Sequence, residues 1–120
     1  MRFFGYDLEL TVETILAAGA GPSLFTASDS QGTSWLVAQV GYEGSNLAWV
    51  CAPLSERASQ AVVDGRADPR DAVRHSLTGT VELVTVGEGR AIQDRCLLCG
   101  DLPPELLSAI PDYVAVPAAT

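Results

Sequence analysis

Lysine is absent from this sequence, and positive charge is scarce overall. The seven basic residues are all arginine and face 15 acidic residues, which gives a net charge of −8 at pH 7. Such a surface repels phosphate groups, so we expect no nucleic-acid partner. An acidic balance mostly serves solubility and less often selects a basic partner.

Long hydrophobic runs are also missing. No apolar stretch approaches the roughly 20 residues that a membrane helix requires, so we expect no membrane span. The opening residues MRFFGYDLELTVE lack an apolar segment of the length found in signal peptides. Cysteine occurs three times, an odd number that predicts no disulfide framework. We therefore expect a cytoplasmic protein, and the Lys-free, Ala- and Gly-rich composition is typical of a bacterial source.

Enough apolar sequence is present for a stable core. The chain has 120 residues, of which 48% are hydrophobic, so residues 1–120 are expected to form a single domain.

The pattern along the chain predicts an α+β fold. Three short strands joined by tight turns form an antiparallel meander over residues 24–53. Residues 8–17 fit either a strand or a helix. We expect a mostly antiparallel sheet of five or six strands with two or three short helices, and no nucleotide-binding βαβ units. The further strands are expected near 79–87, 91–98 and 113–116, and the helices at 56–64, 69–77 and 103–110.

Capping residues mark where these helices begin and end. Ser55 is the predicted N-cap of the first helix, and Gly65 its C-terminal stop. Asp68, followed by Pro69 at the first helical position, begins the second. Asp101, together with Pro103, Pro104 and Glu105, is expected to begin the third.

Three segments in this order resemble a family of small bacterial domains of unknown function. They are GPSLFTASDSQGTSWLVAQV, WVCAPLSERASQAVVDGRADPRDAV and the later LPPELL. The similarity covers roughly residues 20–110 and includes the pattern LF-x-A-x-D-x-x-G-x-x-W-L. It implies turns, strands and helix caps but no catalytic residues, so it assigns no activity.

Cys96 and Cys99 form a C-x-x-C pair followed by Gly100, which is the shape of half a zinc site. Zinc needs two further ligands, and the remaining soft candidates are Cys51 and His75. Cys51 lies in an apolar strand, and helix geometry turns His75 toward solvent. A redox pair would require a helix N-terminus at the first cysteine. We expect no metal cofactor, and zinc at Cys96 and Cys99 remains the alternative.

Arg66, Arg70 and Arg74 form a small basic stripe near the second helix. Such a stripe is a candidate site for a phosphate or another anionic ligand. The alternative is a solvated helix face on which Asp71 pairs with Arg74.

The two neighbouring strands expected at 34–42 and 47–53 are apolar on both faces, so both faces of the sheet must be covered. Trp35 and Val37 share one face, and a turn near 43–45 places Trp49 on that same face, across from Gln39. If that face is open, these side chains are anchors for a partner. The alternative is that both tryptophans belong to the core.

The sequence favours a binding role over catalysis. With a single histidine, no cysteine or serine nucleophile can be matched to a base. We predict a non-enzymatic interaction or accessory module that binds a protein partner or a second copy of itself through Trp35, Val37 and Trp49. The alternatives are a zinc-supported domain, and an anionic-ligand sensor or enzyme with a pocket near the arginine stripe.

Overall fold

The computed structural model describes residues 2–4, 9–18, 22–43, 46–87, 90–111 and 113. These residues form an antiparallel sheet and three short α-helices, which confirms the predicted α+β class. In chain order the elements are β1 (Arg2–Phe4), β2 (Glu9–Ala18), β3 (Pro22–Ser28), β4 (Ser34–Glu43), β5 (Asn46–Leu54), α1 (Glu56–Val63), α2 (Pro69–Arg74), β6 (Thr80–Gly87), β7 (Arg90–Leu98), the 3-10 turn η1 (Cys99–Asp101) and α3 (Pro104–Ser108).

The sheet is an uninterrupted meander. Its strands lie in the order β1 to β7, and each strand is antiparallel to the next. Six strands have seven or more residues, while β1 has three. The ambiguous segment 8–17 lies mostly in the strand β2. The expected strand at 113–116 falls outside the described residues except for Tyr113, which is not in a strand.

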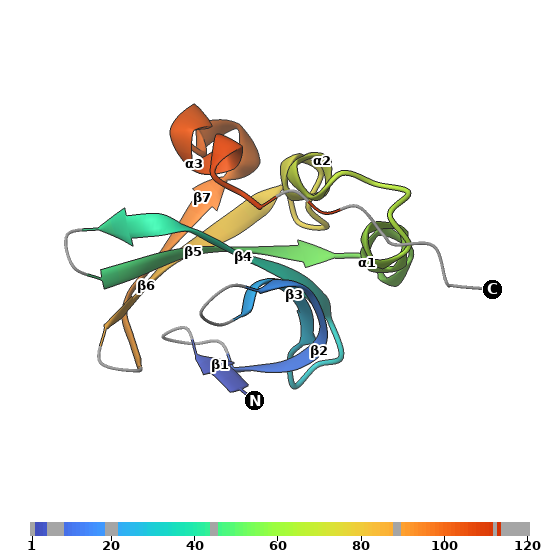
Figure 1. The fold of residues 1–120 in the computed structure, drawn as a ribbon, viewed down its shortest axis with the longest axis horizontal. Coiled ribbons are helices and arrows are strands. Elements are labelled where there is room, and N and C mark those ends of the chain that lie inside the picture. The colour runs from blue at the N-terminus through green and yellow to red at the C-terminus, as the bar shows by residue number, and fades with distance from the viewer. Residues whose placement is uncertain are drawn as a thin grey trace.

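All three helices lie on one side of the sheet, and β1 to β3 curl round on the other side (Figure 1). The predicted caps of the first two helices are confirmed. The Ser55 hydroxyl accepts a hydrogen bond from the Ala58 amide at 3.1 Å, and the Asp68 carboxylate accepts one from the Arg70 amide at 2.8 Å. Gly65 follows α1 with a φ of +75°, the left-handed conformation that glycine adopts most readily.

Helix α2 ends three residues earlier than expected, at Arg74 rather than residue 77. The Ser76 hydroxyl donates to the Thr80 carbonyl at 2.7 Å, and the Leu77 amide donates to the Pro53 carbonyl at 2.7 Å. These bonds draw the chain back to the sheet, and Leu77 is exposed.

Helix α3 also differs in how it begins. Asp101 lies in η1, and Pro103 occupies the N-cap position of α3 without a side-chain hydrogen bond. Asp101 therefore lies before the helix and does not cap it, whereas Pro104 and Glu105 stand in the first turn as the predicted start signal requires.

Two hydrophobic clusters fill the two sides of the sheet. The helix-side cluster lies between the sheet and the helices and includes Leu36, Val50, Val62 and Val73. The inner cluster occupies the concave side, where Leu10 of β2 meets residues of β3 to β6. Both faces of the central strands are thus covered within one chain, as their two-sided apolar pattern requires. No helix of the described residues is long and apolar enough to cross a membrane.

Candidate functional site

The predicted aromatic surface lies in the inner cluster. Trp35, Val37 and Trp49 share one face as expected, and Trp49 is paired with Gln39. They are, however, 8%, 0% and 8% exposed, and Phe25 packs edge-on against Trp49 with ring centroids 5.9 Å apart. Their placement matches the core alternative, because the curl of the sheet brings β2 and β3 over them. They offer no open surface to a partner in this fold.

The D-x-x-G-x-x-W part of the predicted motif is a turn that holds one of these tryptophans. The Asp29 carboxylate accepts hydrogen bonds from the amides of Gln31 at 2.8 Å and Thr33 at 2.9 Å. Its other oxygen accepts one from the Trp35 indole at 3.0 Å. Burial alone would raise the pKa of Asp29, but these three donors outweigh burial and lower it. The motif is therefore structural.

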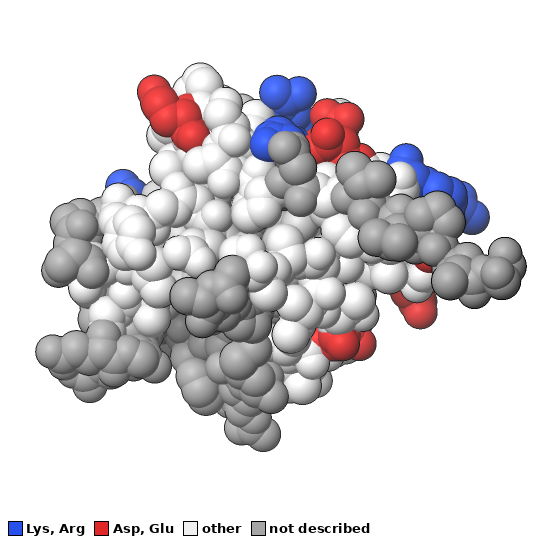
Figure 2. Space-filling model, in the orientation of Figure 1, with Lys and Arg blue, Asp and Glu red and all other residues white. Residues whose placement is uncertain are grey.

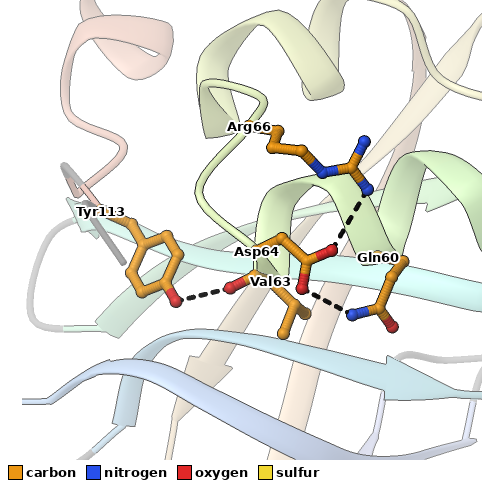
Figure 3. A network of polar contacts seen from close by, with 5 residues as sticks. All are labelled: Gln60, Val63, Asp64, Arg66 and Tyr113. Carbon is orange, nitrogen blue, oxygen red and sulfur yellow. Dashed lines mark hydrogen bonds and ion pairs between the residues drawn. The ribbon is translucent and has the colours of Figure 1, made fainter. Parts of the chain in front are cut away.

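The arginine stripe does not converge on one site. Arg66 pairs with Asp64 at 3.1 Å, and Gln60 also donates to that carboxylate at 2.8 Å (Figure 3). These hydrogen bonds, from Gln60 first and then Arg66, lower the pKa of Asp64. Arg74 lies 3.6 Å from Asp71, which is the pairing considered in the sequence. Figure 2 shows acidic side chains close to the basic ones over the helices.

Arg70 has a different, structural role. Its guanidinium donates to the carbonyls of Ile110 at 2.8 Å and Ser108 at 3.4 Å, which follow and end α3. Tyr113 makes a parallel link from its hydroxyl to the Val63 carbonyl at 2.7 Å (Figure 3). Side chains from α2 and from the chain after α3 thus tie the C-terminal part to the other two helices.

Of the three arginines, Arg74 alone lines a described pocket. This pocket of about 310 Å³ is bounded by α2, η1 and α3, and its other walls are Cys99, Gly100, Leu102, Pro104 and Leu107. The predicted anion site near three arginines is thus reduced to a single, partly paired guanidinium beside apolar side chains.

The two cysteines of the C-x-x-C pair face opposite sides of the sheet. Cys96 is exposed and is paired with Glu82, on the concave side. The Cys99 thiol packs against the helix-side cluster, donates to the Val73 carbonyl at 3.3 Å and lies 3.2 Å from the Ser76 hydroxyl. Within the described residues, no group of three or more His, Cys, Asp or Glu side chains is placed to hold a metal ion.

In the part of the chain that the structure describes, β7 forms an open edge of the sheet. This strand has nine residues, whereas β1 at the other edge has three. In the described part of the chain, no strand pairs with the outer side of β7. An edge strand presents a row of backbone N–H and C=O groups, which proteins commonly shield by shortening the strand. The sheet follows that rule at β1 and departs from it at β7.

The side chains at the end of β7 are open to solvent. Leu98 is 61% exposed, and Cys96 is the exposed cysteine of the three. Further inward, burial and then the charges of Glu82 and Asp94 raise the pKa of the Cys51 thiol well above its usual range. Cys51 therefore stays neutral and packs as a small apolar residue, while Cys96 is the most exposed of the three thiols.

Sequence reasoning predicted the strand at 91–98 but not its position at an edge. That position follows from the order of all strands, because each strand pairs with the next one along the chain. In a simple meander the last strand has a neighbour on one side only. The predicted meander was therefore the one feature of the sequence from which the edge position of this strand could have been inferred.

The comparisons with known proteins identify no relative. No family model, no curated protein and no solved structure matches this chain. The resemblance to small bacterial domains therefore stays a prediction, and functional inference depends on the geometry of the chain itself.

Proposed function

We propose that this chain is a non-enzymatic protein-binding module that takes an extended segment of a partner as an eighth strand along β7. The observation that carries the proposal is that, among the described residues, no strand pairs with the outer side of the nine-residue strand β7. Strand addition supplies main-chain hydrogen bonds, which give affinity, while alternate side chains of the added strand give specificity.

The end of β7 supports an apolar contact within that interaction. Leu98 is a large apolar side chain left in solvent at the edge, where an added strand would cover it. Asp94 in the middle of the strand places a negative charge along the edge, which favours one alignment of a partner strand over shifted ones.

The proposal includes the setting of the protein. We take it to be a cytoplasmic bacterial protein that uses neither a metal cofactor nor a nucleic-acid partner. Three free cysteines and a net charge of −8 support this setting, since free thiols suit a reducing compartment and excess acid repels phosphate.

Crosslinking from Cys96 tests the edge. A photoreactive maleimide on this exposed thiol is irradiated in an extract of the native host, and crosslinked peptides are identified by mass spectrometry. We expect one protein to be captured through an extended segment, and Leu98→Lys to lower its yield at least tenfold, because a charged edge residue opposes strand addition.

Two controls separate the edge from the rest of the surface. Cys96→Ser measures reaction at other thiols, and Cys96→Ser with Arg57→Cys moves the probe to the exposed side of α1. Equal capture of the same protein from position 57, or no capture from Cys96, contradicts the proposal. Slowed amide hydrogen exchange in β7 on binding distinguishes strand addition from contact of side chains alone.

A further inference from the structure

A polar groove runs along the N-terminal end of α1, on the helix side of the sheet. It consists of two adjoining hollows of about 360 and 170 Å³, which share Glu13, Ser34 and Glu56. Helix α1 packs on β4 and β5, so the groove lies where β2 and β3 curl away from the helix (Figure 1). The smaller hollow is also lined by Thr14, Thr26 and Ser59.

A β-bulge brings Glu13 to this groove. In the pairing of β2 with β3, Val12 is opposite Ala27 and Thr14 is opposite Thr26, so Glu13 is the extra residue. Bulges redirect a side chain from the regular alternation of a strand and occur often beside binding sites. Glu56 reaches the groove from the first turn of α1.

Neither carboxylate is neutralised by the fold. Within the described chain, Glu13 and Glu56 make no ion pair and no side-chain hydrogen bond. Two unpaired negative charges thus border one groove in a protein whose net charge is already −8.

Two largely buried residues with hydroxyl side chains also line the groove. Thr26 and Ser59 are 3% and 9% exposed, and both line the smaller hollow. No hydrogen bond joins either hydroxyl to another described residue. Neither oxygen is a buried atom without a partner, so both hydroxyls remain accessible and can accept hydrogen bonds from a ligand in the hollow that they line.

The residues that line the two hollows determine which charge and shape of ligand can bind there. It offers carboxylate and hydroxyl oxygens and no basic side chain, so an anion would be repelled. A divalent metal ion would find two carboxylates, and no third His, Cys, Asp or Glu of the described residues joins them. A compact cation with several N–H donors satisfies convergent oxygens in a hollow of about 170 Å³.

We propose that this groove binds a primary alkylammonium group, held between Glu13 and Glu56 and hydrogen-bonded by Thr26 and Ser59. The ammonium is a point charge with three donors, while the alkyl chain lies along Leu54 and Leu77 in the larger hollow. No side chain of this protein can supply it, because the sequence contains no lysine. The source is a lysine of another protein or a free amine. This proposal does not depend on β7.

Titrations followed by amide NMR shifts at low salt test this site. The probes are 1,5-diaminopentane, a short lysine-containing peptide, its Nε-acetyllysine form and its arginine form. We expect the first two to shift residues around Glu13, Thr26 and Glu56, and the acetylated peptide to bind at least tenfold more weakly. Comparing the diamine with the lysine peptide identifies the source.

Variants decide whether the groove is responsible. Glu13→Gln with Glu56→Gln should weaken binding at least tenfold, and Thr26→Val severalfold, whereas Glu105→Gln, in the first turn of α3, should leave it unchanged. Equal binding to the double variant, shifts spread over the whole acidic surface, or tighter binding of the arginine peptide would overturn the proposal. Circular dichroism confirms that each variant is folded.

Discussion

Charged residues lie near both ends of helix α1, and the fold uses them differently. Past its C-terminal end, Arg66 is paired with Asp64, and Arg70 donates to main-chain carbonyls near α3. At its N-terminal end, Glu13 and Glu56 border a groove and pair with no other described side chain. Arg70 ties α2 to the chain that follows α3, whereas Glu13 and Glu56 have no partner among the described residues and remain available to a ligand.

A charged side chain can bind a ligand only if it is not already paired within the fold. The number of charges in a region does not by itself make a binding site. A charge already matched within the fold must break that match before it can hold a ligand, and the cost of doing so reduces affinity. The arginine stripe attracts attention in an acidic sequence because positive charge is rare there. In this fold, however, the arginines are already paired with neighbouring carboxylates and main-chain carbonyls.

Among these predictions, we expect Arg70→Ala to cause the largest loss in the free energy of unfolding. This change removes the donor to the carbonyls of Ile110 and Ser108 and should lower the free energy of unfolding by about 2 kcal/mol, as for other charged hydrogen bonds. Urea denaturation followed by circular dichroism measures it. Arg74→Ala, one turn along α2, is the matched control and should cost under about 0.5 kcal/mol, because its ion pair is exposed. Equal losses in the two variants would show that Arg70 is not structural.

Asp29 is a carboxylate that, unlike Glu13 and Glu56, accepts hydrogen bonds within the fold. Replacing it tests what a partnered carboxylate contributes to stability. Asp29→Ala should lower the free energy of unfolding by about 1 kcal/mol through loss of the bonds from Gln31, Thr33 and Trp35. The pKa of Asp29 is lowered in the folded state from 3.8, so the wild-type advantage is present above that pH. It should be lost as the pH falls through the folded-state pKa. Urea titrations of both proteins at neutral and strongly acidic pH measure this, and a pH-independent difference would contradict it.

Features set by neighbouring residues were predictable from the sequence. Ser55 and Asp68 cap their helices as expected, because a cap depends on residues two or three positions away. The two-residue alternation of strands likewise placed Trp35 and Trp49 on one face. The separation of Cys96 from Cys99 does not follow from this alternation, because Cys99 lies past the end of β7, in η1.

Features that depend on the curvature of the sheet were not predictable. Burial of the tryptophans requires β2 and β3 to fold over them, and irregular pairing in β2 and at Gly41 in β4 increases the local twist. The groove joins Glu13 to Glu56 across distant parts of the sequence and depends on the same irregularity. Neither residue belongs to a motif, so the sequence offered no signal for the pair beyond a general excess of acid.

We expect the substitutions in the groove to cause the smallest change in the free energy of unfolding. If Glu13 and Glu56 are there to bind, Glu13→Gln with Glu56→Gln should change the free energy of unfolding by no more than about 0.5 kcal/mol, because no contact is lost. Removing two like charges from a protein of net charge −8 should, if anything, stabilise it. Urea denaturation at low and high salt checks this, with Asp29→Ala as the reference for a carboxylate that has partners. A loss as large as that reference would mean that the two glutamates support the fold, and the contrast between the two ends of α1 would then disappear.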